Sequence, residues 1–495
     1  MTRILLVHPS KWGRGITAIW VASHAAALKA RRHEVRLFDA TFFPDWAEDE
    51  VGFNTQNHQY QPTDYERMIT WKAPGVAQAL QALLDAYQPE VVFWSALSSH
   101  IHGEGEYVSI QYGCQLLADC CTKALKVCGG LQPTADLVGT FNRFPQLDAL
   151  IAGESELPLA DLADALRDNR ATDAMPGLSR RQADGSLCLG ARQPILRDLD
   201  LLGPYDYSLF EEQVFLRPYN GEVVKAVDYE MSRGCVFTCA YCVETVIQRY
   251  YGFTEANDRG VLKYAKAYLR CKSAPRVMEE LTQLHLEHGI TLIRAQDTNF
   301  LTIDRPTLLH LAELMEAARL PILLYIETRP EGVTKETIPL LKRLQVDGIG
   351  MGIELSGQEF RESQLNRYSD QTRIIEAFKL LRAAGIRRTA YNIIGLVGQD
   401  EDSILETISF NRQLDPDNVT VAFYSPFLGT RQQEEGVQED FFNAYEVNVD
   451  PQLRTVSHHG GLPSHLLEFY KAHFKTLVED GLEALPALKA KAGLG

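Results

Sequence analysis

The sequence has no apolar run that approaches the length of a membrane span. The apolar run within its opening residues, MTRILLVHP, is too short for a secretory signal. Basic residues are outnumbered, with 49 Lys and Arg against 65 Asp and Glu and a net charge of −16. A face that binds nucleic acid needs an excess of basic side chains. We therefore expect a cytoplasmic protein without a membrane span and without nucleic acid as a partner.

Cysteine is also scarce, with nine residues in a chain of 495. An odd number without a signal segment favours thiols that stay reduced. Three of the nine, Cys235, Cys239 and Cys242, lie in the stretch MSRGCVFTCAYCVE. No second pair follows at the spacing that would close a zinc site, although zinc remains the alternative. Three cysteines on one loop can instead hold three irons of a four-iron cluster and leave the fourth open.

The residues before these cysteines alternate in hydrophobicity from Val223 to Tyr229, as in a strand, and Gly234 permits a turn. The C-x-x-x-C-x-x-C spacing, with Tyr241 directly before the last cysteine, resembles the radical S-adenosylmethionine (SAM) superfamily. The resemblance implies a [4Fe–4S] cluster on the three cysteines that cleaves SAM into methionine and a 5′-deoxyadenosyl radical. It also implies an electron donor such as flavodoxin or ferredoxin, and a place for Tyr241 near the adenine.

The first third of the chain alternates between strand and helix patterns, which predicts a parallel sheet covered on both faces. Ligands bind at the carboxyl ends of such strands. The expected strands are 3–7, 34–38, 90–97, 124–128 and 149–152, and the expected helices are 18–30, 76–87 and 106–120. Val108, Tyr112, Leu116 and Cys120 form an apolar stripe on the last helix, so we interpret Cys120 and its neighbour Cys121 as packing residues.

Three loops follow the expected strands: residues 8–13, 95–100 and 129–134. Together, and placed before a radical SAM signature, they resemble the cobalamin-binding domain of cobalamin-dependent (class B) radical SAM enzymes. In that family the S-x-L and G-G elements line the slot for the nucleotide tail of cobalamin. The resemblance implies cobalamin contacts from Ser95, Leu97, Ser99, Gly129 and Gly130.

Two further elements of this domain were compared. Residues 153–156, Gly-Glu-Ser-Glu, resemble the G-E-x-E turn that closes it. The D-x-H-x-x-G element, which supplies a cobalt ligand in classical cobalamin enzymes, is absent, because the first loop reads HPSKWGRG. We therefore name no lower axial ligand, and we interpret His100 and His102 as ordinary loop residues.

Beyond the cysteines, six strand–helix units extend to Tyr424 and predict a partial barrel with its active groups at the carboxyl ends of the strands. Residues 352–357, GIELSG, resemble the family's G-x-E-S-G turn with Leu355 inserted. That likeness implies SAM contacts from Glu354 and Ser356. Residues 365–367 resemble a downstream basic position of the family, and residues 392–398 resemble its fifth-strand turn beside the adenine. These two likenesses imply SAM contacts from Arg367, Asn392 and Gly395.

The expected organisation is α/β. A Rossmann-like cobalamin-binding domain (1–168) and a linker (169–222) with a hairpin at residues 183–185 precede a partial (β/α)6 radical SAM barrel (223–430). A small C-terminal helical region (431–495) follows, with Ser464 as the cap of a helix, and is placed over the barrel mouth on the substrate side. His458 and His459 precede that helix and are interpreted as loop residues.

The leading hypothesis is a cobalamin-dependent C-methyltransferase that acts on an unactivated carbon of a small molecule or natural product. A radical cyclase, rearrangement or dehydration enzyme, with or without cobalamin, is the second hypothesis. The third is a non-catalytic iron–sulfur or zinc protein that uses its Rossmann-like domain to bind partners.

Overall fold

The computed structural model describes residues 1–56, 60–97, 103–173, 175–445 and 460–494. The chain forms two compact units. Unit 1 consists of residues 1–233, 246–253 and 270–293, and unit 2 of residues 234–245, 254–269 and 294–495. No helix in the described part of the chain has both the length and the apolar character that crossing a membrane requires.

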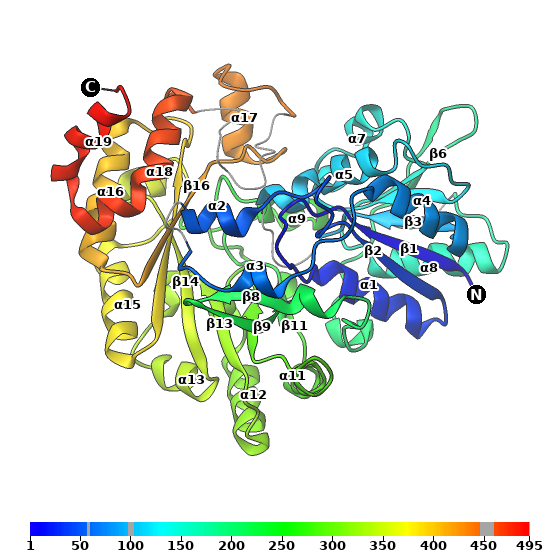
Figure 1. The fold of residues 1–495 in the computed structure, drawn as a ribbon, viewed down its shortest axis with the longest axis horizontal. Coiled ribbons are helices and arrows are strands. Elements are labelled where there is room, and N and C mark those ends of the chain that lie inside the picture. Colours follow the sequence, from blue (N-terminus) through cyan, green and yellow to red (C-terminus); the bar gives the residue numbers. More distant parts are fainter. Residues whose placement is uncertain (57–59, 98–102, 174, 446–459, 495) are drawn as a thin grey trace. The chain divides into compact units, whose positions relative to one another are not determined.

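Unit 1 contains a sheet with the strand order β2-β1-β3-β4-β5-β6-β7 (Figure 1). Its strands are β1 (Arg3–His8), β2 (Glu34–Asp39), β3 (Val91–Trp94), β4 (Leu125–Cys128), β5 (Ala149–Ile151), β6 (Leu178–Arg181) and β7 (Leu187–Cys188). Strands β1 to β5 are parallel, while β6 and β7 form an antiparallel hairpin. The Rossmann-like sheet and the hairpin at residues 183–185 are thus confirmed.

Helices cover both faces of this sheet because alternate residues of β1 and β3 are buried on opposite sides. Leu5 and Val7 pack with α4 (Val76–Tyr87) and α5 (Gly103–Leu116). On the other face Phe93 contacts the rings of Trp20 and His24 of α1 (Ile19–Ala30), which packs with α8 (Glu156–Arg167). Both patterns are those of a strand buried on two sides.

The cysteines that follow α5 differ in their surroundings. Cys120 is buried, as its place on the apolar stripe predicts. Cys121 is exposed, so its interpretation as a packing residue is wrong, because the helix already ends at Leu116 and the stripe does not continue.

The rest of unit 1 contains short elements and one long helix. These are α2 (Glu50–Gln56), α3 (Tyr65–Met68), α6 (Leu131–Ala135), α7 (Leu137–Arg143), β8 (Leu216–Tyr219), β9 (Glu222–Tyr229), β10 (Ser232–Arg233), β11 (Arg270–Cys271) and α11 (Ala274–His288). The expected strand before the cysteines is β9, and it pairs antiparallel with β8. Strand β10 pairs antiparallel with β11.

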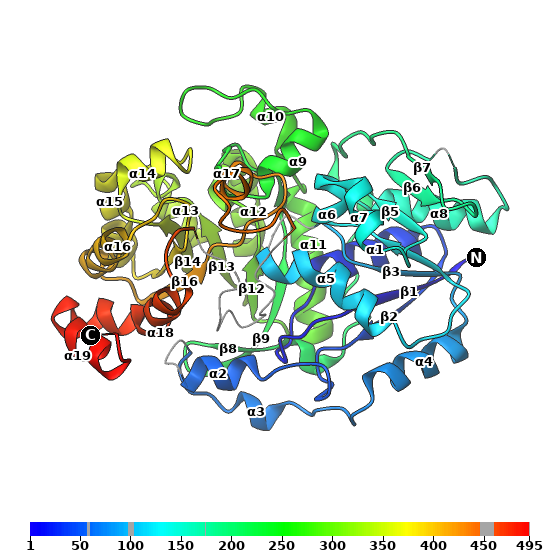
Figure 2. The ribbon, with the colours of Figure 1, turned by 90° about the horizontal axis from the view of Figure 1, so that it is seen from above.

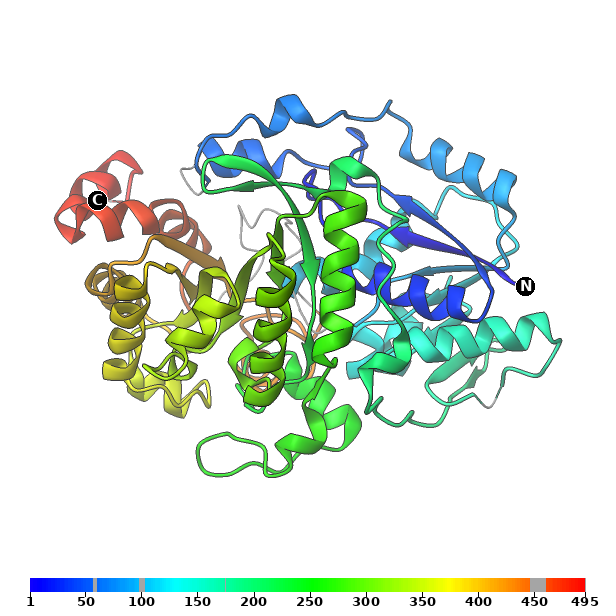
Figure 3. The same cartoon turned by 90° about the horizontal axis from the view of Figure 1, so that it is seen from below.

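Unit 2 contains the half-barrel strands in sequence order, and helices follow β12, β13, β14 and β15 along the chain (Figure 3). The strands are β12 (Leu292–Ala295, where unit 1 passes into unit 2), β13 (Leu323–Thr328), β14 (Val346–Glu354), β15 (Arg387–Ile394) and β16 (Asn418–Phe423). The helices are α10 (Ala265–Tyr268), α12 (Arg305–Ala318), α13 (Ile338–Arg343), α14 (Gln358–Ser363), α15 (Gln371–Ala384) and α16 (Glu401–Leu414). Strands β13 to β16 are parallel.

Three of these helices begin at an aspartate, which is why their starts are readable from the sequence. The side chains of Asp304, Asp370 and Asp400 each accept a hydrogen bond from a backbone N–H in the first turn. Such caps satisfy amide groups that have no partner within the helix. The α/β fold class, with a half-barrel after the Rossmann-like sheet, is confirmed.

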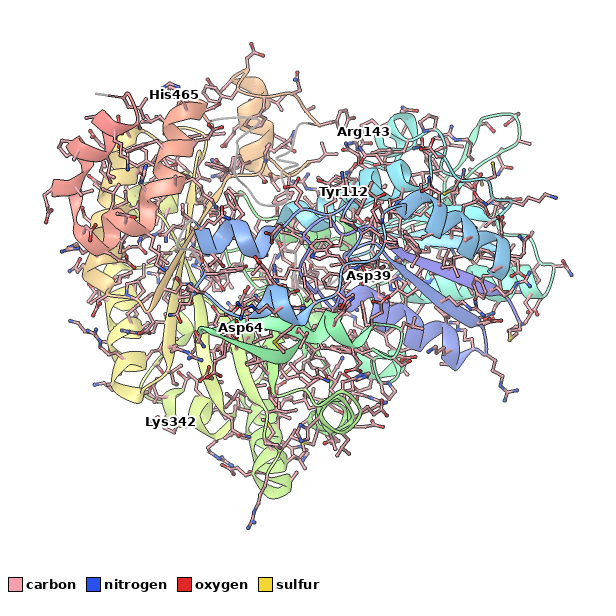
Figure 4. The ribbon with its side chains drawn as sticks, viewed as in Figure 1. Asp39, Asp64, Tyr112, Arg143, Lys342 and His465 are labelled. Carbon is pink, nitrogen blue, oxygen red and sulfur yellow. The ribbon has the colours of Figure 1, made fainter. Side chains whose placement is uncertain are left out.

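The C-terminal part comprises α17 (Arg431–Gln438), α18 (Ser464–Asp480) and α19 (Leu485–Lys491). The buried face of α18 includes Leu467, Tyr470 and Phe474, and it packs against α16 and β16 (Figure 2). Ser464 is not the cap, because Pro463 occupies that position and no side chain caps the helix. His465 lies in the first turn (Figure 4). The position of this region over the barrel mouth stays a prediction, and His458 and His459 lie outside the described residues.

Candidate active site

The three cysteines predicted as metal ligands lie on one loop between β10 and α9 (Glu244–Tyr251). Cys235 and Cys239 are buried, Cys242 is partly buried, and all three are free thiols. Gly234 begins the loop with a φ of +98°, and a Cβ atom there would lie 3.0 Å from the ring of Tyr268. Only glycine therefore fits this turn without strain.

Hydrogen bonds connect this loop to three other segments of unit 2. Thr238 donates from its backbone N and its Oγ1 to the carbonyl of Gly260, at 2.9 and 3.1 Å. The backbone N of Ala240 donates to the carbonyl of Leu365 at 2.8 Å. The carbonyl of Ala240 accepts from the backbone N of Gln432 at 3.1 Å. The chain itself thus sets the conformation of the loop.

The electrostatic surroundings of the thiols combine burial with nearby cations. Burial raises the pKa of Cys235 to about 12, and burial also raises the pKa of Cys242 well above its usual value. The Nη1 atoms of Arg329 and Arg367 lie 3.9 and 4.0 Å from the Sγ of Cys239. Buried thiols of this kind lose their protons when a metal coordinates them, and the two guanidinium groups can offset the resulting negative charge.

The side-chain spacing also bears on the kind of metal centre. Over the described ranges, no group of three or more His, Cys, Asp or Glu side chains lies close enough to hold a single metal ion. A zinc site needs all its ligand atoms within about 2.3 Å of one ion. Cysteines that hold a cluster instead each bind a different iron and can lie farther apart.

Beside the cysteines, Tyr241, Glu354 and Arg367 form a connected polar group. The Tyr241 hydroxyl donates to Glu354 Oε1 at 2.9 Å and accepts from Arg367 Nη1 at 3.3 Å. Arg367 also pairs with Glu354 at 3.5 Å and donates to the carbonyl of Gly352 at 2.5 Å. The surrounding negative charges outweigh burial and raise the pKa of Arg367 well above its usual value. Three residues that the family resemblance singled out from distant parts of the sequence are therefore in contact.

The inserted residue Leu355 is accommodated by a bulge at the end of β14. The register between β14 and β15 shifts between Gly352 and Glu354, and Glu354 has a φ of +64°. Leu355 is fully buried. The turn is held by Arg361, whose Nη1 and Nη2 atoms donate to the carbonyls of Leu355 and Ser369 at 2.6 and 2.7 Å.

Arg361 was missed in the sequence, because an arginine in a short helix gives no periodic signal of burial. Burial and the charge of Arg367 lower the pKa of Arg361 to about 10. Its role is to position the turn that carries Glu354.

The other three predicted SAM contacts lie in different surroundings. Asn392 donates from Nδ2 to Asn411 Oδ1 of α16 at 3.1 Å, and the backbone N of Ser356 bonds Thr407 Oγ1 of α16 at 3.0 Å. Gly395 has a φ of +85° and donates its N–H to Gln399 Oε1. The polar groups of Asn392 and Ser356 therefore bond the outer helix rather than Tyr241, Glu354 or Arg367, and all three cofactor contacts stay predictions.

The predicted cobalamin residues gather at the carboxyl edge of the sheet in unit 1. Ser95 follows β3 with a φ of +64°, which ends that strand earlier than expected, and its carbonyl accepts from the backbone N of Gly129 at 2.8 Å. A Cβ atom at Gly130 would lie 2.8 Å from Ser95 Oγ. Leu97 is buried beside them. Ser99, like His100 and His102, lies outside the described residues.

The Gly-Glu-Ser-Glu turn of unit 1 contacts the strand that leads into the cysteine loop. Glu156 Oε1 accepts from Arg233 Nη2 at 2.5 Å, and Arg233 also bonds Glu230 at 2.7 Å. Glu154 accepts from Arg270 Nη1 at 2.7 Å. All five side chains are buried. Arg233 was not predicted from the sequence, because its partner Glu156 lies 77 residues away.

Comparison with known proteins places this geometry in a family. Residues 229–410 match the model of the radical SAM superfamily. The anaerobic magnesium-protoporphyrin IX monomethyl ester cyclase of Rubrivivax gelatinosus is 23% identical over 95% of this chain and 77% of its own length. An uncharacterised methyltransferase of Pyrococcus horikoshii is 25% identical over 66% of this chain and 67% of its own length.

Among solved structures, the radical SAM methyltransferase TsrM from Kitasatospora setae has a TM-score of 0.61 at 16% identity. The TsrM structure has cobalamin and a [4Fe–4S] cluster bound. The match covers 89% of this chain and 75% of the TsrM chain. At this identity the likeness concerns the fold. The predicted superfamily is confirmed: through residues 229–410 the chain belongs to the radical SAM superfamily, whose cofactors are a [4Fe–4S] cluster and SAM.

Proposed function

We propose that the protein is a cobalamin-dependent radical SAM enzyme that methylates an unactivated carbon of a small-molecule substrate. The observation that carries the proposal is that one chain contains two separate sets of residues suited to binding a cofactor. Unit 2 has a three-cysteine loop beside a connected Tyr–Glu–Arg group, and unit 1 has a glycine-lined edge on a parallel sheet.

Cys235, Cys239 and Cys242 hold the cluster in this proposal. Burial shields Cys235 and Cys239 from water. Arg329 and Arg367 lie beside Cys239, where they would stabilise the negative charge of a thiolate-bound cluster. Three ligands leave one iron available to SAM. The hydrogen bonds of Thr238 and Ala240 keep the loop in place before the cluster binds.

Tyr241, Glu354 and Arg367 hold SAM. A carboxylate can accept hydrogen bonds from ribose hydroxyls, and a guanidinium can bind the methionine carboxylate. Glu354 is suited to this because its left-handed backbone, fixed by Arg361, turns it out of the strand register. The remaining contacts proposed for SAM are Ser356, Asn392 and Gly395.

The edge of the sheet in unit 1 fits a large ligand. The order β2-β1-β3-β4-β5 places the topological switch point between β1 and β3, where ligands of doubly wound sheets bind. At the ends of β1 and β2, Asp39 Oδ2 is buried without a hydrogen-bond partner, while His8 Nδ1 pairs with Asp39 Oδ1 at 3.4 Å (Figure 4 labels Asp39). Ser95, Leu97, Ser99, Gly129 and Gly130 would contact cobalamin at this edge.

When bound, the cluster supplies the electron that cleaves SAM, and cobalamin supplies a carrier for the methyl group. The contribution of this chain is to bind, orient and shield these groups. No general base is required for hydrogen-atom abstraction followed by methyl transfer.

A radical cyclase is the second candidate. It is favoured by the cyclase of Rubrivivax gelatinosus, which aligns with 95% of this chain. The methyltransferase of Pyrococcus horikoshii favours methyl transfer. The two functions differ in their use of SAM, because only a methyltransferase also uses SAM as a methyl donor.

The test follows from this difference and needs no identified substrate. The chain, reconstituted anaerobically with iron and sulfide, is incubated with SAM and reductant, with and without reduced cobalamin. A methyltransferase forms S-adenosylhomocysteine only when cobalamin is present, in addition to 5′-deoxyadenosine from reductive cleavage. Formation of 5′-deoxyadenosine without any S-adenosylhomocysteine would refute methyl transfer and leave the cyclase.

A further inference from the structure

The strands of unit 2 have an inner face, defined here as the face opposite α15 and α16. On β15, Asn392 bonds Asn411 of α16, and Ile394 packs with Ile404 of the same helix. Successive strand residues point to opposite faces, so Tyr391 lies on the inner face. Polar residues on this face are available to a ligand in the half-barrel.

Three inner-face residues form a hydrogen-bonded group, which we call the inner-face cluster: Tyr325 and Glu327 of β13 and Tyr391 of β15. The hydroxyls of Tyr325 and Tyr391 lie 2.9 Å apart, and Tyr391 donates to Glu327 Oε1 at 3.3 Å. All three side chains are half-buried. They are accessible to a ligand, yet the packing around them restricts their orientation.

Glycine on β14 makes room for this cluster. A Cβ atom at Gly350 would lie 2.5 Å from both the ring and the hydroxyl of Tyr391. The ring of Tyr391 therefore lies directly over Gly350, and any other residue at 350 would displace it. The backbone of Gly350 is not in the left-handed region, so glycine is needed here only to leave space for the ring of Tyr391.

The cluster also lies next to the site proposed for SAM. Tyr391 is the register partner of Gly352, and the carbonyl of Gly352 accepts from Arg367 Nη2. Arg367 in turn lies 4.0 Å from the Sγ of Cys239. A group bound by Tyr391 is therefore adjacent to the residues that would hold the reacting cofactor.

The charges at the cluster select the kind of group that fits. Burial raises the pKa of both phenols, so they remain neutral hydrogen-bonding groups at neutral pH. The negative Glu327 is offset by the positive Arg294 of β12, which acts electrostatically on both tyrosines. An anion would meet Glu327 and a cation would meet Arg294.

We propose that the inner-face cluster is the specificity site for a neutral oxygen group of the substrate, a hydroxyl or a carbonyl. A phenol hydroxyl can donate one hydrogen bond and accept two. A substrate hydroxyl can therefore donate to a phenol oxygen of the cluster, and a carbonyl can accept the Tyr325 proton in place of its bond to Tyr391. The proposal rests on the proposed function, because it assumes that the half-barrel holds SAM and substrate together. It adds the class of polar group and the residues that recognise it.

The test measures fragment binding to the cluster-loaded chain by saturation-transfer NMR. Four fragments share a phenyl ring: benzyl alcohol and acetophenone are neutral, while benzoate and benzylamine are charged. We expect signals from the two neutral fragments only, with a fall of roughly five-fold in Tyr391→Phe and in Tyr325→Phe, since each loses one hydrogen bond. Tyr264→Phe is the matched control, because Tyr264 is exposed on the same unit.

Gly350→Ala is a second, independent variant that keeps both hydroxyls and displaces the Tyr391 ring, and it should lower the same two signals. Equal or stronger binding of benzoate or benzylamine would overturn the proposal, as would neutral signals that neither Phe variant changes. Iron content verifies that each variant is folded. Assaying SAM cleavage on the same samples separates the two proposals, because loss of cleavage with the fragment pattern intact would count only against the proposed function.

Discussion

Replacing Glu156 with glutamine should destabilise unit 1. The change keeps the shape of the side chain but removes the negative charge that pairs with the buried Arg233. The carboxylate of Glu156 bonds Arg233 Nη2 at 2.5 Å and also accepts from Ser23 Oγ at 3.0 Å. Although burial opposes it, the charge of Arg233 lowers the pKa of Glu156 to about 2, against an ordinary value of 4.5. A difference of this size corresponds to about 3 kcal/mol of unfolding free energy at neutral pH.

The pH dependence follows from the sign of that shift. Because the folded-state pKa is lowered, the stabilisation is complete above pH 4.5 and is lost as the pH falls towards about 2. The unfolding free energies of the wild type and of Glu156→Gln should therefore differ most at neutral pH and converge in acid.

Urea unfolding, monitored by tryptophan fluorescence, reports the stability of unit 1, to which Glu156 belongs. All five tryptophans of the chain lie between residues 12 and 94, within unit 1. With a typical urea dependence, a loss of about 3 kcal/mol lowers the midpoint by roughly 1 M. Asp161→Asn is the matched control on the same helix α8, because its ion pair with Arg31 is exposed and exposed pairs contribute about 1 kcal/mol or less. Equal midpoints for the two variants would refute the reasoning.

Three further predictions concern the proposed cofactors. Replacing Cys235, Cys239 and Cys242 together with alanine should abolish the brown chromophore and SAM cleavage after reconstitution, whereas loss of the cluster in Cys128→Ala would contradict the ligand assignment. Tyr241→Phe removes a hydroxyl bonded to Glu354 and should weaken SAM binding roughly ten-fold, since hydrogen bonds to charged groups contribute about 1.5 kcal/mol or more. Equilibrium dialysis measures the affinity, and the iron content should not change. Unaltered affinity would exclude Tyr241 from the site. Gly130→Val places a Cβ atom 2.8 Å from Ser95 Oγ and should abolish cobalamin retention on a desalting column, while a variant that retains one equivalent would locate the cobalamin elsewhere.

Much of the fold was predictable because it depends on local patterns. Buried strands appear as short apolar runs, and helix α4 was predicted with the bounds it has, residues 76–87. The Asp caps of α12, α15 and α16 mark where these helices begin. The short helices α2 and α3 were not predicted, because seven and four residues are too few to show a helical period.

The candidate site was predictable only where a motif names its residues. The cysteine loop follows from spacing alone. The face on which Asn392 lies does not, because its partner Asn411 belongs to a helix 19 residues later. Likewise, Leu355 looks like a disruption of the family turn, and only the bulge in β14 shows how Glu354 still meets Tyr241 and Arg367.

The buried ion pairs of unit 1 give the Gly-Glu-Ser-Glu turn a role that its motif alone does not indicate. Arg233 ends β10, two residues before Cys235, and it is held by Glu156 from one side and by Glu230 from its own strand region. Arg270, its register partner on β11, is held by Glu154. A buried arginine that loses a carboxylate partner is strongly unfavourable, so these pairs allow few alternative positions for β10. The Gly-Glu-Ser-Glu turn thus fixes β10, the strand of unit 1 that ends directly before Gly234.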